Sequence, residues 1–251
     1  DLKHYSSAPQ WTPPPKLWSA ITRTAMGETL MVDLVGSGRG SGGLYAGQTV
    51  GLHVARTPIS GTIFYWATGA SGKKNGIIQI DAGTTVARDY YTQANNGTGR
   101  CAGCHAVSRD GKKMLFVEYD SAFTNYIKGL EVETGQSFIT PDVEIGDFFA
   151  FDRTGARFFS SQAGVLSLRS AATGAVQGTV PNPAGRKSSH PDWSPTEDRL
   201  VFARYPSKYG DDYHFCNGEL AVMDIKGGGG PWNAKVIVPS SGPGDHNYYP
   251  T

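Results

Sequence analysis

A repeated pattern, one turn followed by one apolar strand, constrains the fold of this chain more than any other feature. The pattern occurs at residues 108–117, 152–159 and 194–202. Corresponding turn positions are 44 residues apart between Asp110 and Thr154, and 42 residues apart between Thr154 and Thr196. A regular step of this length indicates one supersecondary unit repeated along the chain.

A second repeated unit, a strand that ends in a hairpin turn, alternates with the first. Its turns are Asp81-Ala82-Gly83, Glu133-Thr134-Gly135, Ala172-Thr173-Gly174 and Ile225-Lys226-Gly227. A period of about 40–45 residues with paired hairpins is typical of four-stranded β-propeller blades. The sequence therefore predicts blades at 61–95, 100–141, 143–181 and 188–239. An ordinary β-sandwich with chance similarity between its strands is the alternative.

The first 60 residues lack this repeat. Two strand-like stretches, 29–35 and 49–55, flank a Gly/Ser-rich loop at 36–43. No stretch keeps helical apolar spacing over three turns without Gly or Pro. We expect an all-β chain, with a small β-sandwich-like domain at 1–60 and a β-propeller domain at 61–251.

The C-terminal residues 245–251 resemble the opening of a fifth blade. Four blades and the start of a fifth cannot bury the inner faces of a propeller. We therefore expect the propeller to be incomplete in this chain. Either a segment beyond residue 251 or a second chain would complete it.

The net charge and the hydropathy of the chain limit the kinds of partner that we expect. The formal net charge is +1, with 23 basic and 22 acidic residues, so no electrostatic attraction to nucleic acid is expected. No apolar run approaches about 18 residues, so no membrane-spanning helix is expected.

The chemistry-bearing motif is Cys101-Ala102-Gly103-Cys104-His105. Haem c attachment needs two thiols at a fixed short separation, which add to the two vinyl groups, and an adjacent imidazole that reaches the iron. Cys-x-x-Cys-His is a recognised signature of this attachment. The sequence predicts one covalent haem c, bound through Cys101 and Cys104, with His105 as the proximal axial ligand.

Two other interpretations of the motif stay open. A zinc site would need further Cys or His ligands at motif spacing, and the chain has no second Cys-x-x-Cys. A disulfide or a redox dithiol would need only Cys101 and Cys104, but thioredoxin-type pairs precede a helix, whereas here a turn and a strand follow.

The second axial ligand is predicted from the alignment of the repeats. That alignment puts Cys104 level with His190, so His190 is the first candidate for the distal ligand. His246, at the start of the predicted fifth blade, is the second. The other candidates are His4, His53, His214, Met26, Met31, Met114 and Met223. An open sixth position is also possible, and axial identity sets the redox potential and reactivity.

Two weaker features give further candidate site residues. Asp211 and Asp212, in a Tyr-Gly-Asp-Asp-Tyr loop, have side chains of the type that binds calcium, although an exposed loop without a metal is the preferred explanation. Cys216 has no partner cysteine left in this chain. It is either a free thiol or pairs with a cysteine outside this segment.

The phrases at 190–195 and 108–112 resemble the repeats of TolB-like (WD40-like) bacterial propellers. The run 61–66, followed downstream by the haem motif, is similar to secreted bacterial propellers that carry a single haem motif. The resemblance covers residues 61–251. It implies export across the inner membrane, to the periplasm or the cell surface, which agrees with haem c being attached on that side.

These features give three expectations for function. The first is electron transfer through a His-ligated haem, with another cytochrome or a redox protein as partner. The second is a partner-binding scaffold in which the covalent haem is structural. The third is a haem enzyme or sensor with an open sixth site. An enzyme would need an acid or base near the iron, which the sequence cannot place. We expect a non-enzymatic role before an enzymatic one, and electron transfer first, because a covalently attached cofactor is otherwise hard to justify.

Overall fold

The computed structural model describes most of the chain. It describes residues 3–8, 10–37, 42–57, 60–68, 75–84, 86–120, 124–139, 146–196, 198–225, 232–242 and 244–250. The chain divides into two compact units, residues 1–63 with 80–87 and residues 64–79 with 88–251. Each unit is described separately.

In its described residues, the first unit contains one helix and two small ladders. They are α1 (Pro15–Thr24), β1 (Thr29–Val32), β2 (Val35–Ser37), β3 (Leu44–Ala46) and β4 (Val50–His53). β1 pairs with β4 and β2 pairs with β3, both antiparallel. The two predicted strand regions thus contain strands, and the sandwich interpretation stays a prediction.

The helix α1 was not predicted. It has ten residues, fewer than three turns, and none of them is buried. Pro15 at its first position supplies a fixed φ that suits a helix start, which is the local reason why this segment is helical. A helix this short, with no buried side, is below what an apolar-spacing criterion detects.

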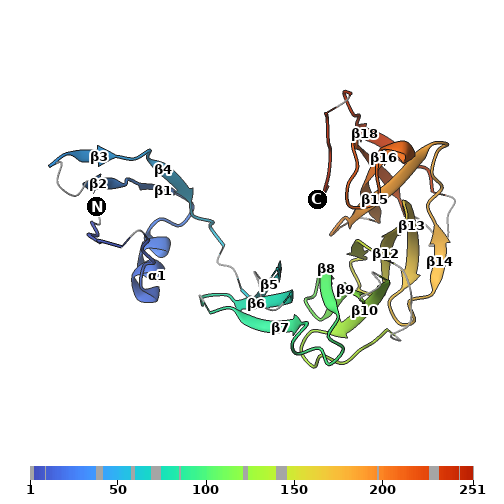
Figure 1. The fold of residues 1–251 in the computed structure, drawn as a ribbon, viewed down its shortest axis with the longest axis horizontal. Coiled ribbons are helices and arrows are strands. Elements are labelled where there is room, and N and C mark those ends of the chain that lie inside the picture. The colour runs from blue at the N-terminus through green and yellow to red at the C-terminus, as the bar shows by residue number, and fades with distance from the viewer. Residues whose placement is uncertain are drawn as a thin grey trace. The chain divides into compact units, whose positions relative to one another are not determined.

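Four antiparallel sheets follow in chain order, as Figure 1 shows from teal to orange. The first two have three strands each: β5 (Thr62–Ala67), β6 (Gly76–Asp81), β7 (Arg88–Thr92), then β8 (Cys101–Val107), β9 (Lys113–Tyr119), β10 (Asn125–Glu131). The other two have four: β11 (Phe149–Phe151), β12 (Arg157–Gln162), β13 (Val165–Ser170), β14 (Val176–Thr179), then β15 (Arg186–Trp193), β16 (Arg199–Pro206), β17 (Glu219–Asp224), β18 (Lys235–Val238). A short 3-10 helix, η1 (Ser207–Tyr209), follows β16.

Each predicted blade corresponds to one of these sheets, in which consecutive strands pair as neighbours. The all-β, open propeller architecture predicted from the repeat is therefore confirmed. The fourth sheet begins at Arg186, two residues before the predicted boundary at 188.

The repeated turns have a common chemistry. The Asp110 carboxylate accepts hydrogen bonds from the Ser108 hydroxyl and the Lys112 N–H. In the third blade the Asp152 carboxylate, at the position that Ser108 has in the second, accepts from the N–H groups of Thr154 and Ala156. An Asp that bonds to the backbone two residues ahead fixes a turn, which is why an aspartate precedes the second strand in both blades.

The hydrophobic core lies between neighbouring blades rather than in one central layer. One cluster joins Leu115 and Val117 of the second blade to Phe149 and Phe158 of the third. The next cluster joins the third and fourth blades; its members include Phe159, Leu166, Leu168, Trp193, Leu200 and Phe202. Strand side chains alternate between the two faces of a sheet. Each sheet can therefore pack one apolar face against each neighbouring blade.

A β-bulge interrupts the first strand of the second and fourth blades. In β8 the pair Gly103–Val117 is followed by Ala106–Leu115, so two residues of β8 lie opposite one residue of β9. The same shift occurs in β15, between Ser189 and Asp192. The first extra residue is Cys104 in β8 and His190 in β15, with φ of 48° and 50°.

These equal conformations confirm the predicted alignment of Cys104 with His190. The corresponding residue near the C-terminus is Tyr249, which has a φ of 45° and is followed by a proline, as His190 is. The predicted equivalence of His246 with His190 is therefore wrong by three residues. A positive φ in three non-glycine residues at repeated positions marks them as a feature of the fold.

Candidate functional site

The two thiols of the Cys-x-x-Cys-His motif lie on the same face of β8. Cys101 is paired with Tyr119 across the ladder, and directly paired residues point to one face. The Cys104 Sγ lies 3.9 Å from the Tyr119 hydroxyl. In a regular strand, residues three apart point to opposite faces. The bulge at Cys104 changes this alternation, so that Cys104 points to the same face as Cys101.

His105 points to the opposite face of β8 from the thiols. Its Nε2 lies 3.2 Å from the backbone carbonyl oxygen of Phe64 in β5, and this contact holds the ring against the first blade. Burial lowers the pKa of His105, with the Phe64 contact opposing the shift. The ring is therefore neutral at pH 7, which is the form that binds metal.

Both thiols are free and protonated. Burial raises the pKa of the Cys104 thiol to about 11 and also raises the pKa of Cys101. Three residues of extended strand span about 10 Å, whereas a disulfide needs Cα atoms within about 7 Å. The extended β8 therefore opposes a disulfide between Cys101 and Cys104.

His190 lies in a box of aromatic rings. Phe148 stacks on its imidazole at a centroid distance of 3.8 Å, and Tyr249 meets it edge-on at 4.3 Å. Phe215 approaches at 5.6 Å. The residue is 4% exposed, and neither ring nitrogen has a hydrogen-bond partner among the described residues. Burial lowers the pKa of His190 to about 4, so this imidazole is neutral.

A buried imidazole with two unpaired nitrogens is costly, because each desolvated polar atom loses its bonds to water. Such an orphaned group needs an explanation, and an absent metal or ligand is one. Stacking on Phe148 compensates for the loss of ring contacts with solvent but not for the loss of hydrogen bonds.

Aromatic residues surround the same region. Phe148 in the third blade is equivalent to Cys104 in the second and His190 in the fourth. Each lies two residues before a residue of the next ladder pair: Ala150, Ala106 and Asp192. Burial, and then the Cys104 thiol, raise the pKa of the Tyr249 hydroxyl. Phe148 and Tyr249 both contact the His190 ring, so these residues meet around one imidazole.

A hydrogen-bonded chain leads away from Cys104. The Tyr119 hydroxyl, beside the Cys104 thiol, is hydrogen-bonded to the Tyr213 hydroxyl. Tyr213 in turn donates to the Asp147 carboxylate at 2.5 Å. This chain joins the second, third and fourth blades. The sequence pattern did not reveal it, because these residues are far apart in the chain.

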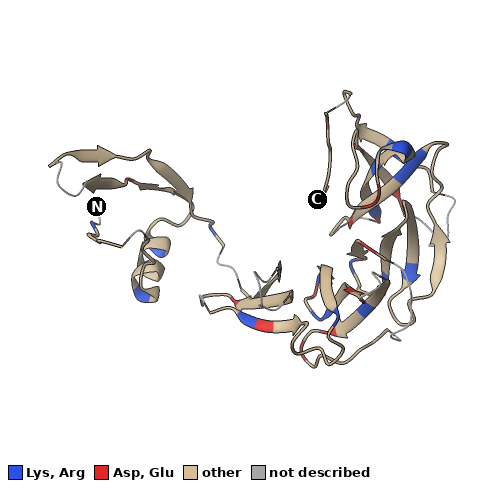
Figure 2. Cartoon of the chain, viewed as in Figure 1, with Lys and Arg blue, Asp and Glu red and all other residues tan. Residues whose placement is uncertain are grey.

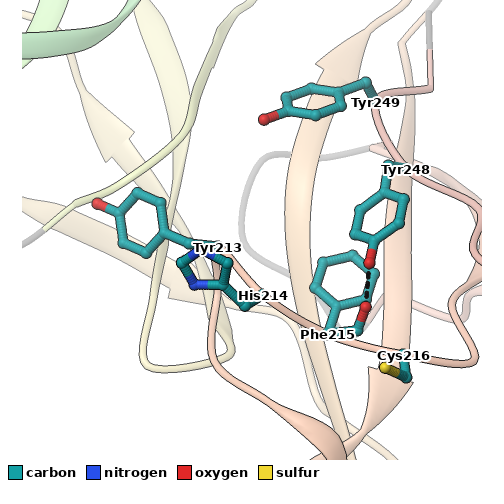
Figure 3. Close-up of a pocket in the computed structure, with 6 residues that line it drawn as sticks. All are labelled: Tyr213, His214, Phe215, Cys216, Tyr248 and Tyr249. Carbon is teal, nitrogen blue, oxygen red and sulfur yellow. Dashed lines mark hydrogen bonds between the residues drawn. The ribbon is translucent and has the colours of Figure 1, made fainter.

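An open pocket of about 410 Å³ lies next to these residues; its lining is Tyr213, His214, Phe215, Cys216, Tyr248 and Tyr249. Figure 3 shows the hydrogen bond from the Tyr248 hydroxyl to the Phe215 carbonyl, which ties the C-terminal segment to this wall. Phe215 and Tyr249 also contact His190. The pocket is therefore next to the aromatic box.

The other predicted ligands differ in exposure and in the unit to which they belong. Met114 and Met223 are core residues, 0% and 2% exposed. The His214 side chain is 89% exposed, and His246 is exposed with its ring 6.0 Å from that of Tyr248. His4, His53, Met26 and Met31 belong to the first unit. Cys216 is an exposed free thiol.

The two predicted calcium ligands, Asp211 and Asp212, differ in exposure. The Asp211 side chain is 67% exposed, whereas Asp212 is 2% exposed and accepts a hydrogen bond from Tyr205 at 2.7 Å. Among the described residues, no three His, Cys, Asp or Glu side chains form a cluster that could hold a metal ion.

Two general properties of the surface follow from the described residues. Figure 2 shows lysine and arginine, and aspartate and glutamate, distributed over several strands and loops, in keeping with the net charge of +1. No helix in the described part of the chain has the length and hydropathy to cross a bilayer.

Comparison with known proteins defines the fold class and nothing narrower. No family model matches the chain, and no curated protein matches it. The crystal structure of TolB from Acinetobacter baumannii is similar to it at a TM-score of 0.51 and 18% identity, over 87% of this chain and 51% of that one.

A putative TolB from Agrobacterium tumefaciens gives a TM-score of 0.48 and 18% identity, over 66% of this chain and 57% of that one. The chain therefore spans about half the length of the structures that it matches. The chain has a TolB-like β-propeller fold.

Proposed function

We propose that the chain is a β-propeller scaffold for one covalent haem c, held by thioether bonds to Cys101 and Cys104. The single observation that carries this proposal is the His190 imidazole, buried with both nitrogens unpaired. It occupies the bulge position of the fourth blade that Cys104 occupies in the second. The orphaned imidazole and the second thiol of the motif thus occupy equivalent positions on two different blades.

The donor set fits the group in chemical terms. Two reduced thiols on one strand face supply the covalent links, and two neutral imidazoles supply nitrogen ligands. His105 would leave its contact with the Phe64 carbonyl to act as the proximal ligand. His190 is the first candidate for the distal ligand, and His246 the second.

The bound group supplies an iron centre that carries one electron. The chain's own residues then have defined roles. Phe148, Phe215 and Tyr249 keep water away from the His190 ring and hold its plane. Neutral imidazole ligands of this kind suit electron transfer with a redox protein or another cytochrome. Because haem c is attached outside the inner membrane, we place the protein in the periplasm or at the cell surface.

The test is a visible spectrum of the purified protein, oxidised and reduced, with a matched set of variants. Cys101→Ala with Cys104→Ala should abolish covalent haem, whereas Cys216→Ala, which removes the exposed thiol, should leave it unchanged. A protein with no covalent haem in any variant would refute the proposal.

Ligand identity is tested by spin state. His190→Ala should convert a low-spin spectrum to a high-spin one, whereas His246→Ala should not. If neither changes the spectrum, His190 is not the distal ligand. A wild-type protein that is already high-spin and binds carbon monoxide would instead support a haem enzyme or sensor with an open site.

A further inference from the structure

Two side chains of the second blade bond directly to the fourth blade, although the third blade lies between these two in chain order. One is Arg109, in the turn that follows β8, and the other is Tyr119, the last residue of β9. Strand pairing occurs only within a blade. These two bonds are therefore tertiary contacts between blades that share no strand ladder.

The Arg109 bond reaches the end of β15. Its guanidinium Nη2 donates to the carbonyl oxygen of Trp193, the last residue of β15, at 2.6 Å, and lies 3.4 Å from Asp192 Oδ1. A charged donor at such a distance forms a strong hydrogen bond. Arg153, at the same position in the turn of the third blade, has an exposed side chain. The turn sequence alone therefore does not produce this contact.

The Tyr119 bond lies at the opposite end of the same two strands. Tyr119 pairs with Cys101, the first residue of β8. Its hydroxyl is hydrogen-bonded to the hydroxyl of Tyr213, which follows η1, next to the end of β16 that pairs with the start of β15. Tyr213 donates its single hydroxyl hydrogen to Asp147. Tyr119 is therefore the donor in the bond between the two hydroxyls.

The two bonds lie on either side of the bulges that contain Cys104 and His190. β8 has seven residues, which span about 20 Å in an extended strand. Apolar packing, which joins both blades to the third, is not directional, whereas a hydrogen bond requires a narrow distance and angle. Two hydrogen bonds at separate points therefore restrain both the separation and the tilt of the second and fourth blades.

The Tyr119 bond also connects Cys104 to the aromatic box of His190. The Tyr119 hydroxyl lies 3.9 Å from Cys104 Sγ and is bonded to Tyr213. The Tyr213 ring lies 5.3 Å from that of Phe148, which stacks on the His190 imidazole. Side-chain contacts thus run without a break from the motif thiol to the buried imidazole.

We propose that Arg109 and Tyr119 are positioning residues, which hold the fourth blade at a fixed separation and tilt from the second and thereby hold His190 in place relative to Cys104. Arg109 acts through the backbone of β15, because the carbonyl that it binds lies three residues after His190. Tyr119 acts through Tyr213. The consequence for haem coordination rests on the proposed function.

The first experiment is a double-mutant cycle, measured by urea denaturation of the full chain, and it requires no haem. Arg109→Met removes the donors and keeps an unbranched side chain, and Tyr119→Phe removes only the hydroxyl. Substitutions at well-separated sites normally have additive effects. If both bonds restrain one blade, losing the first releases it and losing the second then costs less. The double variant should therefore lose clearly less unfolding free energy than the sum of the two single losses.

The control for the cycle is Arg153→Met, in the corresponding turn of the third blade. It should cost little stability and should be additive with Tyr119→Phe. Arg109→Lys keeps one charged donor group and should recover part of the stability that Arg109→Met loses. If Arg109→Met does not fold, Arg109→Gln takes its place in the cycle. Additive losses for the Arg109 and Tyr119 substitutions would overturn the proposal.

The second experiment uses the haem-loaded protein and separates a positioning role from a purely structural one. Arg109→Met and Tyr119→Phe should each give a visible spectrum between those of wild type and His190→Ala, because part of the haem becomes high-spin. Arg109→Lys should shift the spectrum back toward wild type, and Arg153→Met should not change it. If His190→Ala alters the spin state while Arg109→Met and Tyr119→Phe do not, the positioning role is overturned.

The two proposals fail in different ways. A protein without covalent haem, or one whose spectrum does not depend on His190, contradicts the proposed function. The double-mutant cycle would then still decide whether the Arg109 and Tyr119 bonds restrain the same blade. Additive losses in that cycle contradict the joint restraint whatever the haem spectrum shows.

Discussion

Replacing Asp147 with asparagine should stabilise the protein in alkaline solution. The pKa of Asp147 rises from 3.8 to about 6 in the folded state, mainly through burial. The folded state therefore binds a proton more tightly than the unfolded state. Stability supplied by that proton is present below about pH 4 and is lost as pH rises through about 6.

The size of the effect follows from the shift. About two pKa units correspond to about 3 kcal/mol, at about 1.4 kcal/mol per unit. Asparagine has no charge to bury, but it exchanges charge-assisted hydrogen bonds from Tyr213 and Asn125 for neutral ones, at a cost of about 1 kcal/mol. The expected gain at pH 8 is therefore about 2 kcal/mol, with no gain at pH 4.5.

Urea denaturation at pH 4.5 and pH 8 measures this difference from the shift in midpoint. His190 acts in the opposite direction in the wild type, because its pKa is lowered to about 4 and its protonation destabilises the fold as pH falls. Comparing wild type with Asp147→Asn at each pH cancels that contribution. Asp211→Asn is the matched control. An Asp147→Asn protein that is equally destabilised at both pH values would refute the reasoning.

Four further predictions follow from described contacts. Phe159→Ala should lower the unfolding free energy by about 3–5 kcal/mol in urea denaturation, since Phe159 is 0% exposed and packs between Trp193 and Trp232. Gly76→Ala should lower the melting temperature, at a cost above about 1 kcal/mol, because its φ is 153° and a Cβ would lie 2.4 Å from a backbone oxygen. Cys216 should react rapidly with a maleimide in the native protein, and thiol titration after denaturation should find one thiol of three if both motif cysteines are in thioether bonds. His190→Phe should cost less than about 1.5 kcal/mol in urea denaturation, because a ring of similar shape fills the same aromatic box.

The repeat predicted the blades because turn chemistry is local. An aspartate that bonds to the backbone two residues ahead, as Asp110 and Asp152 do, has the same effect wherever it occurs. The register of the repeats also placed Cys104 level with His190, which the shared bulge confirms. Both inferences needed only short-range sequence and a constant period.

The tyrosine chain could not be predicted in this way. Tyr119, Tyr213 and Asp147 meet because their blades pack side by side, and no local pattern encodes that contact. Tyr249 was missed for a different reason. Counting from histidine to histidine chose His246, whereas the proline that follows Tyr249 marks the correct position, as Pro191 does for His190.

At the bulge that starts a blade, the side chain of one residue is not constrained by strand pairing, whereas its neighbours are. Its first residue leaves the ladder, so this side chain points toward other blades while the next ladder pair keeps its partner. A substitution there can change the chemistry of the centre without changing the packing between sheets. Cysteine occupies this position in the second blade and histidine in the fourth, with nearly equal φ. The propeller thus provides one replaceable side chain per bulged blade, and new ligand sets can arise on it by single substitutions with the core left intact.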